Sequence, residues 1–176
     1  MLHTSRLFDG EHIHHDCRVA FADGRIARVE VGVVPQRGDE LLTDGVLAPG
    51  FVDLQINGYA GVDFARADVP DFARVLTALA TTGTTSCLPT LITAPVDEIV
   101  TQLDRISAAS GGPGTRSLGA HVEGPFISPG RRGAHRAELM CDPTPYDVTR
   151  IGAHPATALM TLAPELPGGM DAVAQI

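Results

Sequence analysis

Polar and apolar side chains alternate over much of the first 46 residues, which is the pattern of β-strands with one buried face. Residues 18–21 and residues 25–29 both alternate in this way, and the Asp23-Gly24 pair between them is typical of a tight β-hairpin turn. A further short strand is expected in the loop that follows. We therefore predict that residues 1–46 are all-β and too short to form a stable domain unaided.

From residue 46 onward, mostly apolar stretches alternate with stretches whose apolar residues recur at helical spacing. Four strands are expected to begin near residues 48, 84, 117 and 157, and their spacing fits a β-strand with its crossover helix, roughly 30 or more residues. Helices are predicted over residues 69–80, 96–106 and 145–151, with one more beginning near residue 171. This α/β alternation predicts a parallel sheet covered on both faces. Both an open doubly wound sheet and part of a (β/α)8 barrel would have this pattern.

The first two helices carry recognisable signals at their ends. Pro70 and Asp71 fall in the first turn of the first helix, and Gly83 follows its end. Thr93 is predicted to cap the second helix, because its hydroxyl can accept a hydrogen bond from an unpaired backbone N–H.

Composition and charge narrow the class of protein. Of 176 residues, 44% are hydrophobic and 19% are charged, which is typical of a folded globular chain. The formal net charge of -8 argues against a nucleic acid or an anionic membrane as partner. No apolar run approaches the roughly 20 residues that span a bilayer, and the opening residues lack the apolar segment of a secretory signal. Three cysteines without paired spacing suit a reducing compartment, so we expect a cytoplasmic protein.

The best single candidate for chemistry is Glu123. Functional groups of parallel α/β proteins lie just beyond the carboxyl ends of the strands, and Glu123 follows the predicted strand of residues 117–122. The next loop carries Arg131, Arg132 and His135. The carboxylate could therefore hold a metal while the basic loop holds an anionic substrate. It could equally cap a turn or pair with one of the two arginines.

The other histidines suggest less. His121 lies two residues before Glu123 on the same face of the strand, and we expect it to be a core histidine. His12, His14 and His15 superficially resemble a metal site, but they are far from any predicted strand end and are expected to form a solvated turn. No nucleophile motif is present, and no cysteine lies in surroundings that would lower its pKa.

Four ordered blocks resemble one enzyme family. Residues 47–53 resemble the Pro-Gly-Phe-Val-Asp segment that opens the barrel in the amidohydrolase superfamily. The His-Val-Glu-Gly-Pro sequence within residues 119–126, followed by Arg-Gly-Ala-His at residues 132–135, resembles the signature of the N-acetylglucosamine-6-phosphate deacetylases. Residues 88–93 and residues 161–165 match the same family in the right order. The resemblance covers nearly the whole chain and is weakest over the first 46 residues.

This resemblance implies roles for particular residues. Glu123 matches the glutamate that binds the metal, and Ala134 and His135 match a pair that contacts the sugar, with His135 near its reacting end. Gln55 and Asn57 stand where many amidohydrolases carry His-x-His for one metal of a binuclear pair. The implied cofactor is therefore one divalent metal ion, expected to be zinc, with Gln55 nearby and in contact through a water.

The resemblance also implies a fold and a reaction. Residues 47–176 would be the first half of a metal-dependent (β/α)8 TIM barrel, and residues 1–46 would contribute strands to a small β-sandwich. The complete enzyme would be a homodimer that hydrolyses N-acetylglucosamine 6-phosphate to glucosamine 6-phosphate and acetate. The family's metal-binding histidines and catalytic aspartate follow the last matching block and would lie beyond Ile176. We therefore expect no catalytic residue in this chain, and no activity from it alone.

Two alternatives stay open at this point. The first is another amidohydrolase that acts on a cyclic amide or deaminates a small molecule, although such enzymes usually keep His-x-His where Gln55 and Asn57 stand. The second is a non-catalytic fragment or subunit that assembles with another chain.

Overall fold

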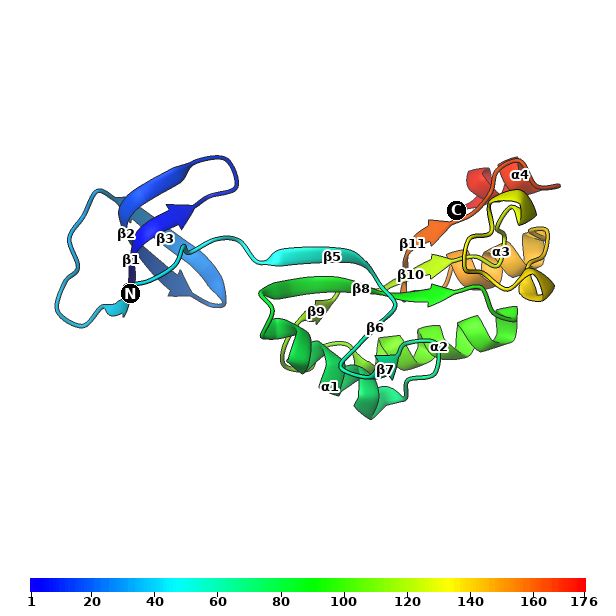
Figure 1. Ribbon diagram of the computed structural model, residues 1–176, viewed down its shortest axis with the longest axis horizontal. Coiled ribbons are helices and arrows are strands. Elements are labelled where there is room, and N and C mark those ends of the chain that lie inside the picture. Colours follow the sequence, from blue (N-terminus) through cyan, green and yellow to red (C-terminus); the bar gives the residue numbers. More distant parts are fainter. The chain divides into compact units, whose positions relative to one another are not determined.

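The first part of the chain forms a four-stranded sheet in the computed structural model, which describes residues 1–176 (Figure 1). Its strands are β1 (Leu2–Phe8), β2 (Ile13–Ala22), β3 (Arg25–Val31) and β4 (Glu40–Leu42). The spatial order is β3-β2-β1-β4, and only the short β4 runs parallel to its neighbour. The prediction of an all-β opening segment is thus confirmed. These strands belong to a compact unit, Met1–Gly50, and the rest of the chain forms a second unit, Phe51–Ile176.

The predicted hairpin joins β2 and β3. Ala22 pairs with Arg25, and the two residues between them, Asp23 and Gly24, have φ angles of 51° and 71°. Positive φ at both central positions defines a type I′ turn, whose twist matches that of the flanking strands. The local sequence alone is sufficient to specify this turn.

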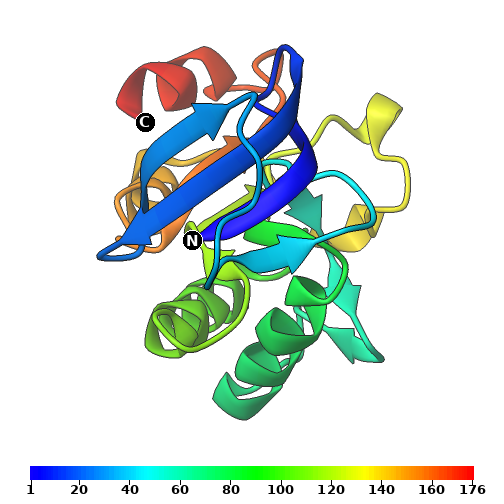
Figure 2. The same ribbon diagram turned by 90° about the vertical axis from the view of Figure 1, so that its left-hand side faces the viewer.

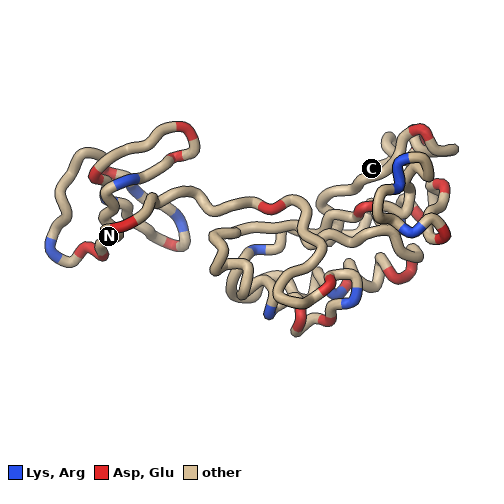
Figure 3. The backbone as a smooth tube through the Cα atoms, in the orientation of Figure 1, with Lys and Arg blue, Asp and Glu red and all other residues tan.

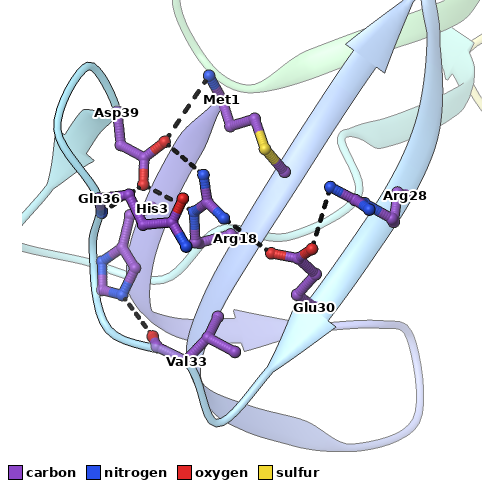
Figure 4. Close-up of polar contacts among 8 residues, drawn as sticks. All are labelled: Met1, His3, Arg18, Arg28, Glu30, Val33, Gln36 and Asp39. Carbon is purple, nitrogen blue, oxygen red and sulfur yellow. Dashed lines mark hydrogen bonds and ion pairs between the residues drawn. The ribbon is translucent and has the colours of Figure 1, made fainter.

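A buried ion-pair network ties the loop before β4 to the sheet of the first unit (Figure 4). The Arg18 guanidinium on β2 donates to both oxygens of Asp39, at 2.7 and 3.0 Å, and to Glu30 on β3 at 2.9 Å. His3 Nε2 lies 3.0 Å from the Val33 carbonyl oxygen at the start of the same loop. Because the Arg18 guanidinium donates to its carboxylate, the pKa of Asp39 is lowered to about 2.

We expect Asp39→Asn to loosen the first unit, because it removes the carboxylate that accepts two hydrogen bonds from the buried Arg18 and leaves only the more exposed Glu30 to pair with it. The pKa of Asp39 is lower in the folded state than its ordinary value of 3.8, so its stabilisation is complete above about pH 4 and is lost as the pH falls towards 2. Amide hydrogen-exchange protection of β1, β2 and β3 should therefore be lower at pH 7 in the variant, and its decline between pH 4 and 2 should be smaller than in the parent. Arg28→Gln, which removes an exposed pair with Glu30, is the control and should change little. Equal protection in Asp39→Asn and the parent at pH 7 would contradict the prediction.

The second unit is built around a parallel sheet. Its strands are β5 (Phe51–Ile56), β8 (Thr84–Ile92), β9 (Arg116–Ser117), β10 (Ala120–Glu123) and β11 (Thr157–Thr161), with a small hairpin of β6 (Gly58–Tyr59) and β7 (Val62–Asp63). Its helices are α1 (Val69–Ala80), α2 (Val96–Ala109), α3 (Pro145–Gly152) and α4 (Gly169–Gln175), with short 3-10 helices at Pro129–Arg131 and Ala137–Leu139. The predicted parallel α/β unit is thereby confirmed. None of these helices combines the length and the apolar character needed to cross a lipid bilayer.

Strand order bears on the two architectures that the sequence pattern left open. The order β5-β8-β10-β11 follows the order of the strands along the chain, and every pairing is parallel. An open doubly wound sheet instead reverses its order at a switch point. The chain therefore winds in one direction through all four strands.

Helices cover one face of this sheet, so the prediction that both faces are covered is wrong for these residues. Ala120 and Val122 on β10 belong to the main core together with apolar residues of α1, α2 and α3. On the opposite face, beside His121 and Glu123, Ile92 and Leu159 are 41% and 40% exposed. Figure 2 shows the three helices following one another along one side of the strands.

Helix α1 forms as its sequence predicts. Asp68 accepts a hydrogen bond from the Asp71 amide, and the Asp71 side chain accepts one from the Asp68 amide, which completes a capping box. Phe72 in the first turns is fully buried and stacks on Phe64, with ring centroids 5.1 Å apart. The apolar stripe of this helix is therefore held against the sheet from its first turn onward.

Two predicted strand boundaries are wrong. The first strand of the parallel sheet begins at Phe51, because Leu47 pairs with Leu7 in the first unit. The predicted strand over residues 117–122 is broken into β9 and β10 at Gly119. This glycine has a φ of 116°, and a Cβ there would lie 2.7 Å from the Ala156 carbonyl oxygen.

Gly119→Ala should therefore destabilise the second unit by about 1–3 kcal/mol, since the new methyl group meets backbone at a φ that side chains rarely adopt. Urea unfolding followed by circular dichroism measures the effect. Gly130→Ala is the matched control, because nothing lies within 4 Å of its Cβ position and its φ is ordinary. Equal unfolding midpoints for the two variants would show that the backbone at position 119 is not constrained.

Candidate active site

The carboxyl ends of three parallel strands bring together side chains that are far apart in the sequence. Gln55 lies near the end of β5, Thr93 comes directly after β8, and Glu123 is the last residue of β10. Glu123 pairs in register with Ile92, so the ends of β8 and β10 lie level with each other. The rule that functional groups gather at this edge predicts the position of Glu123 correctly.

Glu123 is held between an amide and an imidazole. Gln55 Nε2 donates to Glu123 Oε2 at 3.1 Å, and His135 Nε2 lies 3.6 Å from Glu123 Oε1. The side chains of Glu123 and His135 are 22% and 12% exposed, so both are partly withdrawn from water. Neither Arg131 nor Arg132 forms an ion pair with Glu123, so the alternative that the carboxylate pairs with one of these two arginines is wrong.

His135 reaches the site from the loop that follows β10. The His135 amide donates to the Arg132 carbonyl oxygen at 3.0 Å, and Arg132 Nη1 donates back to the His135 carbonyl oxygen at 3.4 Å. The other ring nitrogen, Nδ1, also has a hydrogen-bond partner, since it lies 2.8 Å from Thr93 Oγ1. The ring therefore bridges the ends of β8 and β10.

An open cavity of about 670 Å³ adjoins these groups. It is lined by Asn57, Gly58, Val62, Asp63, Ile92, Glu123, Arg131, Arg132, Gly133, Ala134 and His135. Acidic and basic positions are interspersed along both units (Figure 3), and the loop of Arg131, Arg132 and Arg136 is the densest basic group in the sequence. A cavity of this volume is within the range that small-molecule ligands occupy.

The structure gathers all five residues that the resemblance singles out. Asn57, Glu123, Ala134 and His135 line the cavity, and Gln55 joins them through its hydrogen bond to Glu123. Their roles in binding stay predictions, whereas their proximity is a feature of the fold.

Sequence reasoning missed the position of Thr93 in this site. The N-cap residue of α2 is Pro95, with no side-chain hydrogen bond, so the prediction that Thr93 caps this helix is wrong. Strand β8 also runs as far as Ile92, and Thr93 is therefore the first residue beyond its carboxyl end. The strand-end rule that identified Glu123 would have identified Thr93 had this boundary been known.

His121 lies below the site on the same face of β10. It is 4% exposed, as expected for a core histidine, and its Nε2 lies 2.7 Å from Thr161 Oγ1. Its Nδ1 has no hydrogen-bond partner in the chain, so this core histidine is only half satisfied.

The residues described here do not form a zinc site by themselves. No three His, Cys, Asp or Glu side chains are grouped closely enough to hold a metal ion, whereas zinc takes three or four protein ligands.

The histidine cluster of the first unit differs from its prediction. The expectation that His12, His14 and His15 form a turn is wrong, since the last two lie on β2. The ring of His14 is instead engaged by Asp9, at 2.6 Å.

The cysteines are unsuited to nucleophilic chemistry, as the sequence predicts. Burial raises the pKa of all three thiols, that of Cys87 to about 11, and a nearby carboxylate adds to the effect at each of them. A raised thiol pKa leaves little thiolate at neutral pH.

Comparison with known proteins identifies the family. No protein-family model matches the chain. The N-acetylglucosamine-6-phosphate deacetylase of Bos taurus is 44% identical over 129 residues, which cover 69% of this chain and 32% of the relative. The N-acetylgalactosamine-6-phosphate deacetylase of Escherichia coli is 36% identical over 180 residues, covering 98% of this chain and 46% of the relative.

A solved structure gives the same result. A mutant of N-acetyl-D-glucosamine-6-phosphate deacetylase from Mycobacterium smegmatis, in complex with N-acetyl-D-glucosamine-6-phosphate, superimposes with a TM-score of 0.86 at 29% identity. The match covers 99% of this chain and 46% of the other. The chain spans about a third to a half of the length of these relatives. By sequence and by fold, the chain belongs to the N-acetylglucosamine-6-phosphate deacetylase family.

Proposed function

We propose that this chain is part of an enzyme that hydrolyses the acetamide of N-acetylglucosamine 6-phosphate to glucosamine 6-phosphate and acetate. The observation that carries the proposal is the meeting of Glu123, His135 and Asn57 at one cavity, in a chain whose relatives are named for this reaction. The arrangement places a carboxylate and an imidazole beside a volume suited to a small ligand.

His135 and Ala134 are the proposed contacts to the sugar. Both line the cavity, and the ring of His135 is fixed at its Nδ1 side, so Nε2 is the nitrogen on the side of Glu123. A positioned imidazole can support a carbonyl oxygen or a sugar hydroxyl as charge develops in the transition state. Arg131 and Arg132 line the same cavity and supply the positive charge that an anionic substrate requires.

We further propose that Glu123 is one ligand of a single divalent ion, with zinc as the expected identity and Gln55 as its neighbour. Within residues 1–176, only Gln55 and His135 contact the Glu123 carboxylate, and no three metal-binding side chains are grouped together, which is too few for zinc, so further ligands would have to come from outside them. We assign no general acid or base to this chain and derive no catalytic step from the ion.

For the whole enzyme we propose a (β/α)8 barrel, of which β5, β8, β10 and β11 are four consecutive strands. Their uninterrupted parallel order and the single helical layer support this proposal. A barrel would also bury the apolar side chains Ile92 and Leu159, which lie on the face without helices. The first unit would contribute its strands to a small β-sandwich, and the complete protein would be a cytoplasmic homodimer.

A second candidate substrate is N-acetylgalactosamine 6-phosphate. The Escherichia coli relative named for that sugar matches 98% of this chain. An activity on cyclic amides or a deamination is not favoured, because the relatives described above are all named as deacetylases.

Acetate release by the natural full-length protein tests the proposal. Turnover is expected with N-acetylglucosamine 6-phosphate or its galactosamine epimer, and it should be strongly reduced for the sugars without phosphate. No acetate from either phosphorylated sugar would overturn the proposed function.

Glu123→Gln in the full-length protein should lower bound zinc and kcat/KM together. We expect a loss of about 100-fold or more, which exceeds the effect typical of residues that only orient a ligand. Metal analysis and steady-state kinetics measure the two quantities. Glu138→Gln, at an exposed carboxylate of the same loop region, should leave both unchanged. Full zinc content with normal turnover in Glu123→Gln would show that this residue is not a ligand.

A further inference from the structure

The side chain of Thr93 carries a buried hydroxyl group, and capping of a helix does not account for its position. It is 5% exposed, and it does not cap α2. Its Oγ1 lies 2.8 Å from His135 Nδ1 and 3.5 Å from the carbonyl oxygen of Glu123. A hydroxyl buried in this way normally has a specific partner, and here the shortest contact is to an imidazole.

Gly124 provides the space for this contact. A Cβ at Gly124 would collide with Thr93 Oγ1, and the φ of 97° at this position is one that side chains rarely adopt. The glycine directly after Glu123 therefore lets the end of β10 approach Thr93 closely. The hydroxyl lies where the end of β8, the end of β10 and the histidine loop converge.

The direction of the hydrogen bonds follows from what each group can do. The Glu123 carboxylate can only accept, so the ring proton of His135 is directed towards it at Nε2. The Thr93 hydroxyl then donates to His135 Nδ1 at 2.8 Å, which is much shorter than its 3.5 Å contact with the Glu123 carbonyl oxygen. In that arrangement Nδ1 accepts, and Nε2 carries the proton on the side of Glu123 and the cavity.

We propose that Thr93 is the positioning residue that fixes the ring orientation and the tautomer of His135. The loop that carries His135 contains Gly130 and Gly133, whereas Thr93 directly follows a strand that is paired on both sides. The hydrogen bond thus fixes the side chain of a loop residue relative to the sheet. Side chains on loops are otherwise positioned less precisely than side chains on strands. The inference rests on the proposed function only in taking His135 as a substrate contact.

Kinetics of two variants of the full-length protein provide the first test. Thr93→Val keeps the shape but removes the hydroxyl, and we expect kcat to fall by about 10- to 100-fold with a smaller change in KM. Thr93→Ser keeps the hydroxyl and should restore kcat to within about threefold of the parent. Thr115→Val is the matched control, because Thr115 is equally buried and donates to Thr84 at the opposite end of β8. It should leave kcat unchanged. Unaltered kcat in Thr93→Val, or an equal loss in Thr93→Ser, would overturn the proposal.

The nitrogen spectrum of the His135 ring provides a second test that does not depend on activity. In protein with ¹⁵N-labelled histidine, the parent and Thr93→Ser should show a protonated Nε2 and an unprotonated Nδ1, and Thr93→Val should lose this single fixed state. A protonated Nδ1 in the parent, or an identical ring signal in Thr93→Val, would overturn the inference. If the parent releases no acetate from either sugar phosphate, the proposed function fails, while this spectrum still decides whether Thr93 fixes the ring.

Discussion

The parallel register between β8 and β10 is the constraint on which the site depends. Because Glu123 pairs with Ile92, the carboxylate emerges level with Thr93, which is the next residue after β8. A slip of one residue would turn Glu123 towards the helices and bring a core valine to the site. The helices suppress this slip, since Ala120 and Val122 are fully buried against them. The burial that stabilises the second unit therefore also directs the Glu123 carboxylate to the face of β10 opposite the helices.

Around that carboxylate, groups from three strand ends and one loop are linked by hydrogen bonds. Gln55 and His135 approach the two oxygens of Glu123, and Thr93 engages the other side of the imidazole. None of these contacts is between sequence neighbours, and those made by Gln55 and Thr93 depend on the strands being parallel and level. The contact with Thr93 in this way gives the ring of His135 a defined orientation, although His135 lies on a loop.

The first unit is held together by different means. Its hydrophobic core is small, with Leu7, Cys17 and Val19 buried and Leu47 packed against them. The long loop before β4 has few apolar residues of its own, and the buried pair of Arg18 and Asp39 fixes it instead. A buried charge that is fully paired is costly to disrupt, so this network imposes order where little apolar surface is available.

The local features of this protein could be read from its sequence. The Asp23-Gly24 turn and the capping box of α1 are specified by neighbouring residues, and the position of Glu123 at the edge of the sheet follows from an apolar stretch that ends there. The family resemblance could also be read from residues 119–126 and 132–135, and the comparisons confirm it.

Only the tertiary structure decided the features that depend on distant parts of the chain. The break at Gly119 arises from the close backbone of Ala156, and Thr93 lies against Gly124 and His135, so neither could be seen in a local window. The one-directional strand order is likewise a property of pairing, whereas periodicity reports only which face of an element is apolar. Sequence pattern determines what each segment can form. Contacts between segments determine which side chains meet.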